Sequence, residues 1–167
     1  MRAWVAVLLT VSVLGSEACG GSSHPTPPAV GVKFQREALA VCRAALAQKH
    51  AEGDFPYPDF NPTQPNPSEF PGVARFFTKA VATYSTWLRR MQALGQPPGG
   101  RRAWGDLLKE ITVQLHLHED QRAAAVRGDT KTFASDYQKG FQATTTLQRA
   151  ADAAGVSACG SVVTTAA

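Results

Sequence analysis

The densest group of side chains that could do chemistry in this sequence lies between residues 116 and 120, which read His-Leu-His-Glu-Asp. Imidazole and carboxylate groups are common protein ligands of metals such as zinc. Ligands on one face of a helix are three or four residues apart, so His116 can act with Glu119 or Asp120. His118 points about 200° away from His116 on a helix and falls on an apolar stripe, where we expect a hydrogen-bonded core histidine. His116, Glu119 and Asp120 are therefore a candidate metal site.

Motifs of known catalytic or cofactor chemistry are missing from the chain. It has no H-E-x-x-H, no C-x-x-C-H and no paired Glu-x-x-His, and it lacks the G-x-S-x-G elbow, the phosphate loop and the dinucleotide-binding glycine turn. Its serines and aspartates form no recognisable catalytic arrangement with a histidine. We therefore expect a protein that is not an enzyme and that needs no cofactor.

The three cysteines, Cys19, Cys42 and Cys159, could do a different chemistry. An odd number in an exported protein needs an explanation, and modification of Cys19 would leave an even pair. In an oxidising compartment two remaining cysteines usually pair. The alternative is that Cys42 is a small buried apolar residue. We predict a disulfide bond between Cys42 and Cys159.

The start of the chain has the pattern of a signal peptide. Arg2 precedes an apolar stretch at residues 3–14, and small residues follow it up to Ala18. A helix of about 12 residues spans only about 18 Å, too little for a bilayer of about 30 Å. We predict that cleavage of residues 1–18 exposes Cys19 for diacylglycerol and acyl chains such as palmitate, at the outer face of the cell membrane. Ser16 and Glu17 depart from the usual lipoprotein signal, so free secretion is the alternative.

Residues 19–31, which contain a Gly, Ser and Pro run, are predicted to be a flexible tether. Four later segments repeat apolar residues at helical spacings of three and four. They start near Phe34, Phe70, Trp104 and Phe133. The stripe of the fourth segment consists of Phe133, Tyr137, Phe141, Thr144, Leu147, Ala151 and Ala154.

Breaks between these segments predict where the helices end. Residues 95–100 are rich in Gly and Pro, and Gly128 with Asp129 can end one helix and cap the next. Short connections make consecutive helices antiparallel neighbours. We predict an all-α fold over residues 32–160, an up-down-up-down four-helix bundle, followed by a C-terminal tail at residues 161–167. The first and fourth helices are then neighbours, so that Cys159 can reach Cys42.

A long loop is predicted between the first two helices. Residues 52–68 contain five prolines, which exclude a helix, and three aromatics, Phe55, Tyr57 and Phe60. Long loops in compact domains are often functional. The three aromatics could bind a partner, or they could cover an open end of the bundle.

Several stretches resemble a known class of proteins. These are FPYPDFNPTQPNP followed by FPGVARFF, the ALGQPP connection, and the combination of Cys42 with a terminal GVSACG. Together they resemble uncharacterised small exported lipoproteins of high-GC Gram-positive bacteria, over residues 34–160. The resemblance implies a location and a fold, but that family has no assigned activity.

The charge balance is mildly basic. Without Arg2 and Glu17 of the leader, 17 basic and 13 acidic side chains become 16 and 12, a balance of +4. This excess is too small, and too little interleaved with aromatics, to indicate nucleic-acid binding.

The predicted topology separates the charges. The anchored end collects Lys33, Arg36, Arg89, Arg90, Arg101, Arg102 and Arg149, and the far end holds Glu52, Asp54, Asp59, Glu69, Glu119, Asp120 and Asp129. One hypothesis is that the basic end rests against anionic lipid headgroups. The alternative is that these side chains are simply solvated.

Two functions follow from these patterns. The first is a lipid-anchored, non-catalytic envelope module whose far end meets a partner protein, a peptide or a cell-wall component. The second is a metal or small-molecule binder that uses His50, Asp54, Asp59, or His116 with Glu119 or Asp120.

Overall fold

The structure is a computed structural model that describes residues 30–164. These residues form helices and no β-strand, which confirms the all-α prediction. The elements are α1 (Val32–Ala51), the 3-10 helix η1 (Pro67–Glu69), α2 (Phe70–Ala93), α3 (Arg101–Arg127), α4 (Thr130–Ala153), the 3-10 helix η2 (Ser157–Cys159) and α5 (Ser161–Thr164). The predicted signal peptide, Cys19 and most of the tether lie outside the described residues. None of the described helices combines the length and the apolar character needed to cross a membrane.

The ends of the long helices follow from local chemistry. Asp129 caps α4, because its side chain accepts a hydrogen bond of 3.0 Å from the backbone N–H of Thr132. Gly128, with a φ of 71°, adopts the left-handed conformation that ends α3. Gly95, with a φ of 74°, follows α2 in the same conformation. The predicted stop and cap at Gly128 and Asp129 are confirmed.

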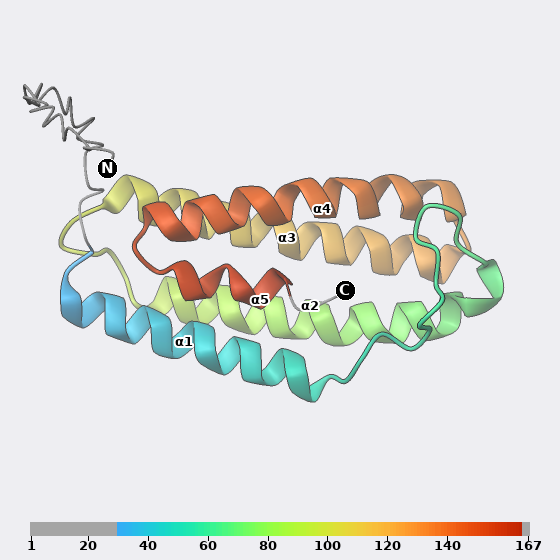
Figure 1. Ribbon diagram of the computed structural model, residues 1–167, viewed down its shortest axis with the longest axis horizontal. Helices are drawn as coiled ribbons and strands as arrows, with labels where there is room; N and C mark the ends of the chain where they lie inside the picture. Colours follow the sequence, from blue (N-terminus) through green and yellow to red (C-terminus); the bar gives the residue numbers. More distant parts are fainter. Residues whose placement is uncertain (1–29, 165–167) are drawn as a thin grey trace, which may run out of the picture.

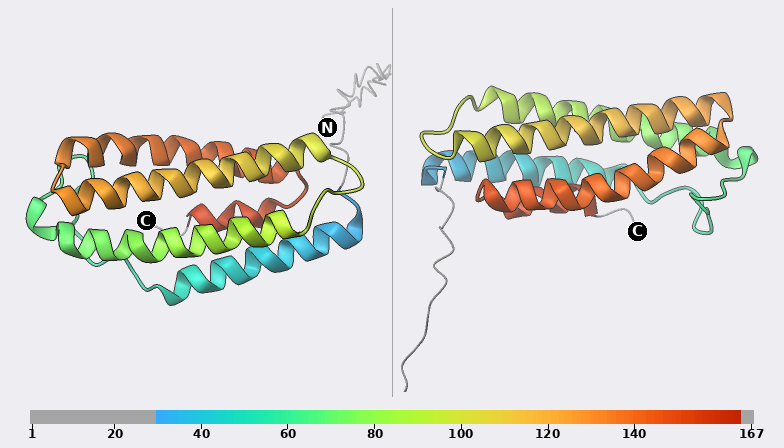
Figure 2. Two further views of the ribbon diagram at one scale, coloured as in Figure 1. Left: turned by 180° about the vertical axis from the view of Figure 1, so that it is seen from behind. Right: turned by 90° about the horizontal axis from the view of Figure 1, so that it is seen from above.

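The four long helices run along a common axis (Figures 1 and 2). In both views α2, α3 and α4 extend along most of the molecule, whereas α1 covers one part of it and the loop of residues 52–66 covers the other. Helix α3 packs against both α2 and α4. Helix α1 packs against α2.

The C-terminal segment lies between α1 and α4. Both η2 and α5 contact α1, and both also contact α4, whereas α1 and α4 share almost no direct contact. The prediction that the first and fourth helices are direct neighbours is therefore wrong. The reason is that residues 156–163 supply the apolar side chains of Val156, Cys159, Val162 and Val163, all of them buried in the space between the two helices.

The predicted domain limits also need correction. Val162 and Val163, assigned to a C-terminal tail, are 0% and 9% exposed and belong to the core. Val30, assigned to the tether, is 1% exposed. Such short apolar stretches at the ends of a chain carry too little periodicity to predict a helix, but burying them removes apolar surface from water.

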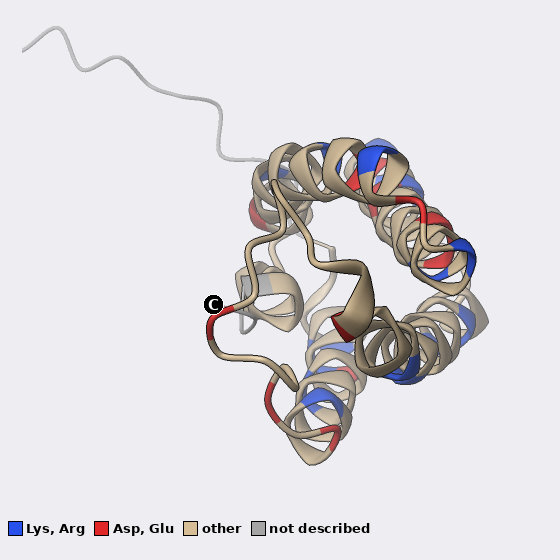
Figure 3. Ribbon diagram, turned by 90° about the vertical axis from the view of Figure 1, so that its right-hand side faces the viewer, with Lys and Arg blue, Asp and Glu red and all other residues tan. Residues whose placement is uncertain are grey.

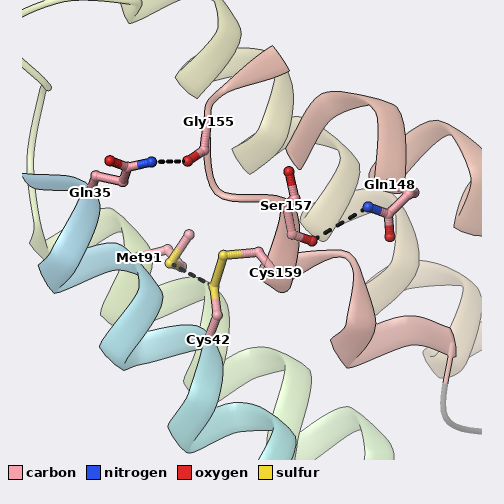
Figure 4. The surroundings of a disulfide bond; sticks show 7 residues. All are labelled: Gln35, Cys42, Met91, Gln148, Gly155, Ser157 and Cys159. Atoms are coloured by element: carbon pink, nitrogen blue, oxygen red, sulfur yellow. Dashed lines mark hydrogen bonds between the residues drawn. A yellow bond between two sulfur atoms is a disulfide. The ribbon is translucent and has the colours of Figure 1, made fainter. Parts of the chain in front are cut away.

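Cys42 and Cys159 form the predicted disulfide bond, with an S–S distance of 2.09 Å (Figure 4). The bond joins the middle of α1 to η2. The Sδ atom of Met91 from α2 lies 3.8 Å from the Cys42 Sγ. Nearby, the Gln35 side chain donates to the carbonyl of Gly155, and the Gln148 side chain donates to the carbonyl of Ser157 at 3.4 Å. The disulfide and these bonds hold the C-terminal segment to both α1 and α4.

The apolar interior consists of two clusters. The first contains the disulfide, Trp87 and Trp104, at the end of the molecule where the described chain begins. The second is aromatic and contains Phe70, Phe77 and Phe133, at the end covered by residues 52–66.

Two glycines in helices should respond oppositely to alanine. A Cβ on Gly105 in α3 meets nothing within 4 Å, so Gly105→Ala should raise the free energy of unfolding by about 1 kcal/mol through helix propensity. A Cβ on Gly72 in α2 would lie 2.7 Å from the Tyr57 ring atom Cε2, so Gly72→Ala should lower the free energy of unfolding. Urea unfolding of both variants tests this, and a shift in the same direction for both would contradict the packing of Tyr57 on Gly72.

Candidate interaction surfaces

The residues proposed as a metal site lie on the surface of α3. His116 and Asp120 are exposed, and Glu119 is partly exposed. His50, Asp54 and Asp59, the other candidate ligands, are exposed at and beyond the end of α1. Within residues 30–164 there is no group of three or more His, Cys, Asp or Glu side chains that could hold a metal ion.

His118 is the hydrogen-bonded core histidine that the sequence predicts. Its ring centre lies 4.5 Å from that of Tyr84 and 5.5 Å from that of Phe77, and its Nδ1 is 3.1 Å from Oε1 of Gln121. The pKa of His118 is lowered to about 4, mainly by burial; the Gln121 hydrogen bond raises it in part, and the positive charge of Lys49 contributes to the lowering. The imidazole is therefore neutral at pH 7.

A polar cluster surrounds the end of α1. Lys49 donates a hydrogen bond of 2.8 Å to the Val162 carbonyl, and the Thr83 hydroxyl donates to the Glu52 carboxylate. Burial lowers the pKa of Lys49, although the charge of Glu52 raises it. Burial also raises the pKa of Tyr84, and the charge of Glu52 adds to that effect. The first bond ties α1 to α5, and the second ties the residue that follows α1 to α2, so the cluster serves the fold.

The three loop aromatics proposed to bind a partner pack against the long helices. The ring centre of Phe55 lies 4.9 Å from that of Phe76, and the ring centre of Phe60 lies 5.7 Å from that of Phe133. Tyr57 lies against Gly72, and all three aromatics are partly buried beside the second cluster. This arrangement is the one expected if the loop covers an open end of the bundle.

Two shallow cavities lie beside this loop. One has a volume of about 180 Å³ and is lined by Glu52, Asp54, Pro56, Gly72, Arg75, Phe76 and Lys79. The other has a volume of about 370 Å³ and is lined by Thr63, Gln64, Pro65, Thr130, Lys131 and Ala134. In the first, Lys79 donates a hydrogen bond of 3.1 Å to the Glu52 carbonyl, which joins the loop to α2. Neither cavity contains an arrangement of side chains typical of catalysis.

An uncovered aromatic pair lies on α4. Phe133 is 0% exposed, but Phe141, about two turns further along the same predicted stripe, is 75% exposed. Tyr137 is 38% exposed. The stripe predicts burial for all three, and the structure corrects that prediction for Tyr137 and Phe141. We call these two residues the α4 aromatic face.

The ends of neighbouring elements explain this exposure. Residues 60–65 lie against the first turns of α4, and η2 lies against Gln148 near its last turns. Helix α1 ends at Ala51 and α5 ends at Thr164, and between the elements at the two ends of α4 Phe141 is largely uncovered and Tyr137 is partly covered. Figure 1 shows that α5 is much shorter than α4. The short first helix and the early start of the Pro-rich loop were the sequence signals that could have indicated this gap in coverage.

The neighbours of the α4 aromatic face on the helix surface are uncharged. Ala134, Gln138 and Thr145 are three or four residues from Tyr137 or Phe141, and none carries a charge. A surface that combines exposed aromatics with an absence of charge has the composition of the centre of a protein interface.

The predicted basic cluster also forms. The start of α1, the end of α2, the start of α3 and the end of α4 lie at one end of the molecule (Figures 1 and 2). This arrangement brings together Lys33, Arg36, Arg89, Arg90, Arg101, Arg102 and Arg149, all of them exposed. We call these seven residues the basic end.

This chain matches no protein-family model, no curated protein and no solved structure. Its function is therefore inferred from the geometry and charge of its own surfaces.

Proposed function

We propose that this protein is an exported, lipid-anchored, non-catalytic binding module of the cell envelope, which contacts a partner protein or peptide through the α4 aromatic face. In this proposal its four long helices act as an up-down-up-down bundle, with residues 52–66 as a Pro-rich covering loop. The module would be of the same kind as the small exported lipoproteins of high-GC Gram-positive bacteria that the sequence resembles.

The exposure of Phe141 is the observation that carries the binding function. Single exposed apolar residues are common on soluble proteins. Phe141, however, adjoins Tyr137 one turn away, on a strip of helix without charge. Tyrosine is enriched among the residues that dominate binding energy, and interface centres are enriched in aromatics and depleted of charge.

The disulfide bond supports the envelope location. Such bonds persist in oxidising compartments and are rare in the cytosol. Cys42 and Cys159 are both almost fully buried, and Cys19 is the remaining cysteine. Lipid on Cys19 would account for the odd number.

Intact mass of the protein from its own cell envelope tests the location. We expect added acyl mass on the chain that starts at Cys19, and an increase of about two hydrogens on reduction, one for each sulfur of a single disulfide. An unmodified chain recovered from the medium would replace the anchored module by a secreted one.

Photo-crosslinking in the cell envelope tests the binding surface. A photoreactive phenylalanine analogue at position 137 should give a discrete adduct, because this position would lie inside the interface. Val126 is a matched control, since it is 72% exposed and belongs to α3 rather than α4. The same products from both positions, or no adduct from position 137, would reject the surface.

The purified crosslinked partner then provides a binding assay. Phe141→Ser should weaken binding at least tenfold, while it changes the free energy of unfolding by less than about 0.5 kcal/mol, because the ring is largely in water already. Val126→Ser should change neither quantity. An adduct of exactly two copies of the chain would identify the surface as a self-association surface.

A further inference from the structure

Charge is distributed unevenly along the molecule. The half that contains the basic end, residues 30–51, 80–115 and 141–164, carries ten basic and four acidic side chains, a balance of +6. The other half, residues 52–79 and 116–140, carries six basic and eight acidic side chains, a balance of −2. Figure 3 looks along the helices from this second half, where the loop of residues 52–66 shows acidic residues in red.

The chain enters the fold at the basic end. Val30 is buried, and a Cβ on the next residue, Gly31, would lie 3.0 Å from Cγ of Pro98. Pro98 belongs to the connection between Arg89 and Arg90 at the end of α2 and Arg101 and Arg102 at the start of α3. Any anchor upstream of Val30 therefore holds the molecule by the end where these four arginines lie.

Helix stability accounts for Arg90 in the last turn of α2, where a positive charge suits the helix dipole, but it does not account for the positive charges in the first turns of α1 and α3. Lys33 in α1, and Arg101 and Arg102 in α3, occupy first turns that contain no acidic residue, where a positive charge opposes the helix dipole. The one ion pair described for the basic end joins Lys33 and Glu37 at 4.0 Å, between exposed side chains. Such a pair contributes little to stability.

An apolar side chain stands among the basic ones. Val32 in the first turn of α1 is 70% exposed, next to Lys33. Basic side chains beside exposed apolar ones are typical of surfaces that rest on an anionic membrane, where the cations meet headgroups and the apolar group enters the interface.

We infer that the basic end, together with Val32, docks on anionic phospholipid headgroups and holds the bundle upright on the membrane. The inference rests on the proposed lipid anchor, which supplies proximity, while the basic end supplies orientation. Helix α3 has 27 residues, so the loop of residues 52–66 would stand about 40 Å from the headgroups at 1.5 Å per residue. The α4 aromatic face would then face sideways, open to a partner in the envelope.

Vesicle binding of an unlipidated chain tests the docking. Residues 19–167 with Cys19→Ser are titrated with phosphatidylglycerol-containing vesicles and with neutral phosphatidylcholine vesicles. Each Lys or Arg near an anionic leaflet strengthens binding by about fivefold. The combined variant Arg89→Glu, Arg90→Glu, Arg101→Glu and Arg102→Glu should therefore bind anionic vesicles at least a hundredfold more weakly. Added salt should weaken binding of the unsubstituted chain.

A matched control separates the basic end from net charge. Arg75→Glu, Lys109→Glu, Arg127→Glu and Lys131→Glu change the net charge equally, at four exposed positions outside the basic end. This control should keep most of the binding, and thermal unfolding confirms that both variants are folded. Equal losses in the two variants, or no binding of the unsubstituted chain to anionic vesicles, would overturn the inference. Binding to a soluble polyglycerol phosphate but not to vesicles would assign the basic end to a wall polymer instead.

Fluorescent probes test the orientation. A probe on Gln96→Cys, exposed in the connection beside the basic end, should be quenched by brominated lipids. A probe on Asn61→Cys, exposed in the opposite loop, should not be quenched. Equal quenching would reject the upright orientation. These measurements leave position 137 free, so failure of docking and failure of the partner surface are separate results.

Discussion

Reduction of the bond between Cys42 and Cys159 is expected to lower the free energy of unfolding by about 5 kcal/mol. The two residues are 117 apart in the sequence, so the bond removes much conformational entropy from the unfolded chain. For a domain of this size the melting temperature should fall by about 15–25 °C. Thermal unfolding followed by circular dichroism, with and without a reductant, measures the difference.

The position of the disulfide bond determines which part of the protein is destabilised first when the bond is reduced. It connects α1 to the C-terminal segment that lies between α1 and α4. In the reduced protein, amide exchange should therefore accelerate around residues 156–163 before it does around Phe133 in the second cluster.

A variant without the bond is the control. Cys42→Ala with Cys159→Ala should melt near the reduced protein and should not respond to reductant, because no other cysteine of the chain after residue 19 remains. If the oxidised and reduced forms of the unsubstituted protein melt together, the bond does not stabilise the native state.

The second large effect is a decrease in the free energy of unfolding at acidic pH. The pKa of His118 falls from 6.5 to about 4 on folding, so between these pH values the folded protein binds fewer protons than the unfolded chain. The stabilisation is complete above pH 6.5 and is lost as the pH decreases to about 4. The loss reaches up to about 3 kcal/mol, since each pKa unit corresponds to about 1.4 kcal/mol. Urea unfolding at pH values from 7.5 to 4 measures it.

Two histidine variants separate this effect from the titration of carboxylates. His118→Gln should flatten the decrease in stability between pH 6.5 and 5, although it also lowers stability at pH 7.5 by loss of packing against Tyr84. His116→Gln, two residues away but exposed, should leave the pH profile unchanged. An unchanged profile in His118→Gln would show that this imidazole does not control acid stability.

Local pattern was sufficient to predict the four long helices. Helical spacing and the signals at Gly128 and Asp129 depend on neighbouring residues in the chain, and the structure confirms them. The same local geometry separated His118, which packs in the core, from His116, which is exposed, because residues two apart on a helix point in different directions.

Local sequence pattern did not predict which side chains of a helix are buried by other elements. Phe133 and Phe141 belong to one apolar stripe, yet one is fully buried and the other is 75% exposed. The difference depends on where α1 and α5 end, which is a property of the packed molecule. The same holds for the C-terminal segment, whose few valines carry no periodic signal.

The sequence by itself therefore determined the helices, the direction of their side chains and the cysteine pair, because each depends on short-range geometry or on compartment chemistry. The tertiary structure alone decided which surfaces remain open. It placed residues 156–163 between α1 and α4, packed the loop aromatics against the second cluster, and left Phe141 largely exposed and Tyr137 partly exposed. Burial requires a partner surface from elsewhere in the chain, and a local pattern does not contain that partner.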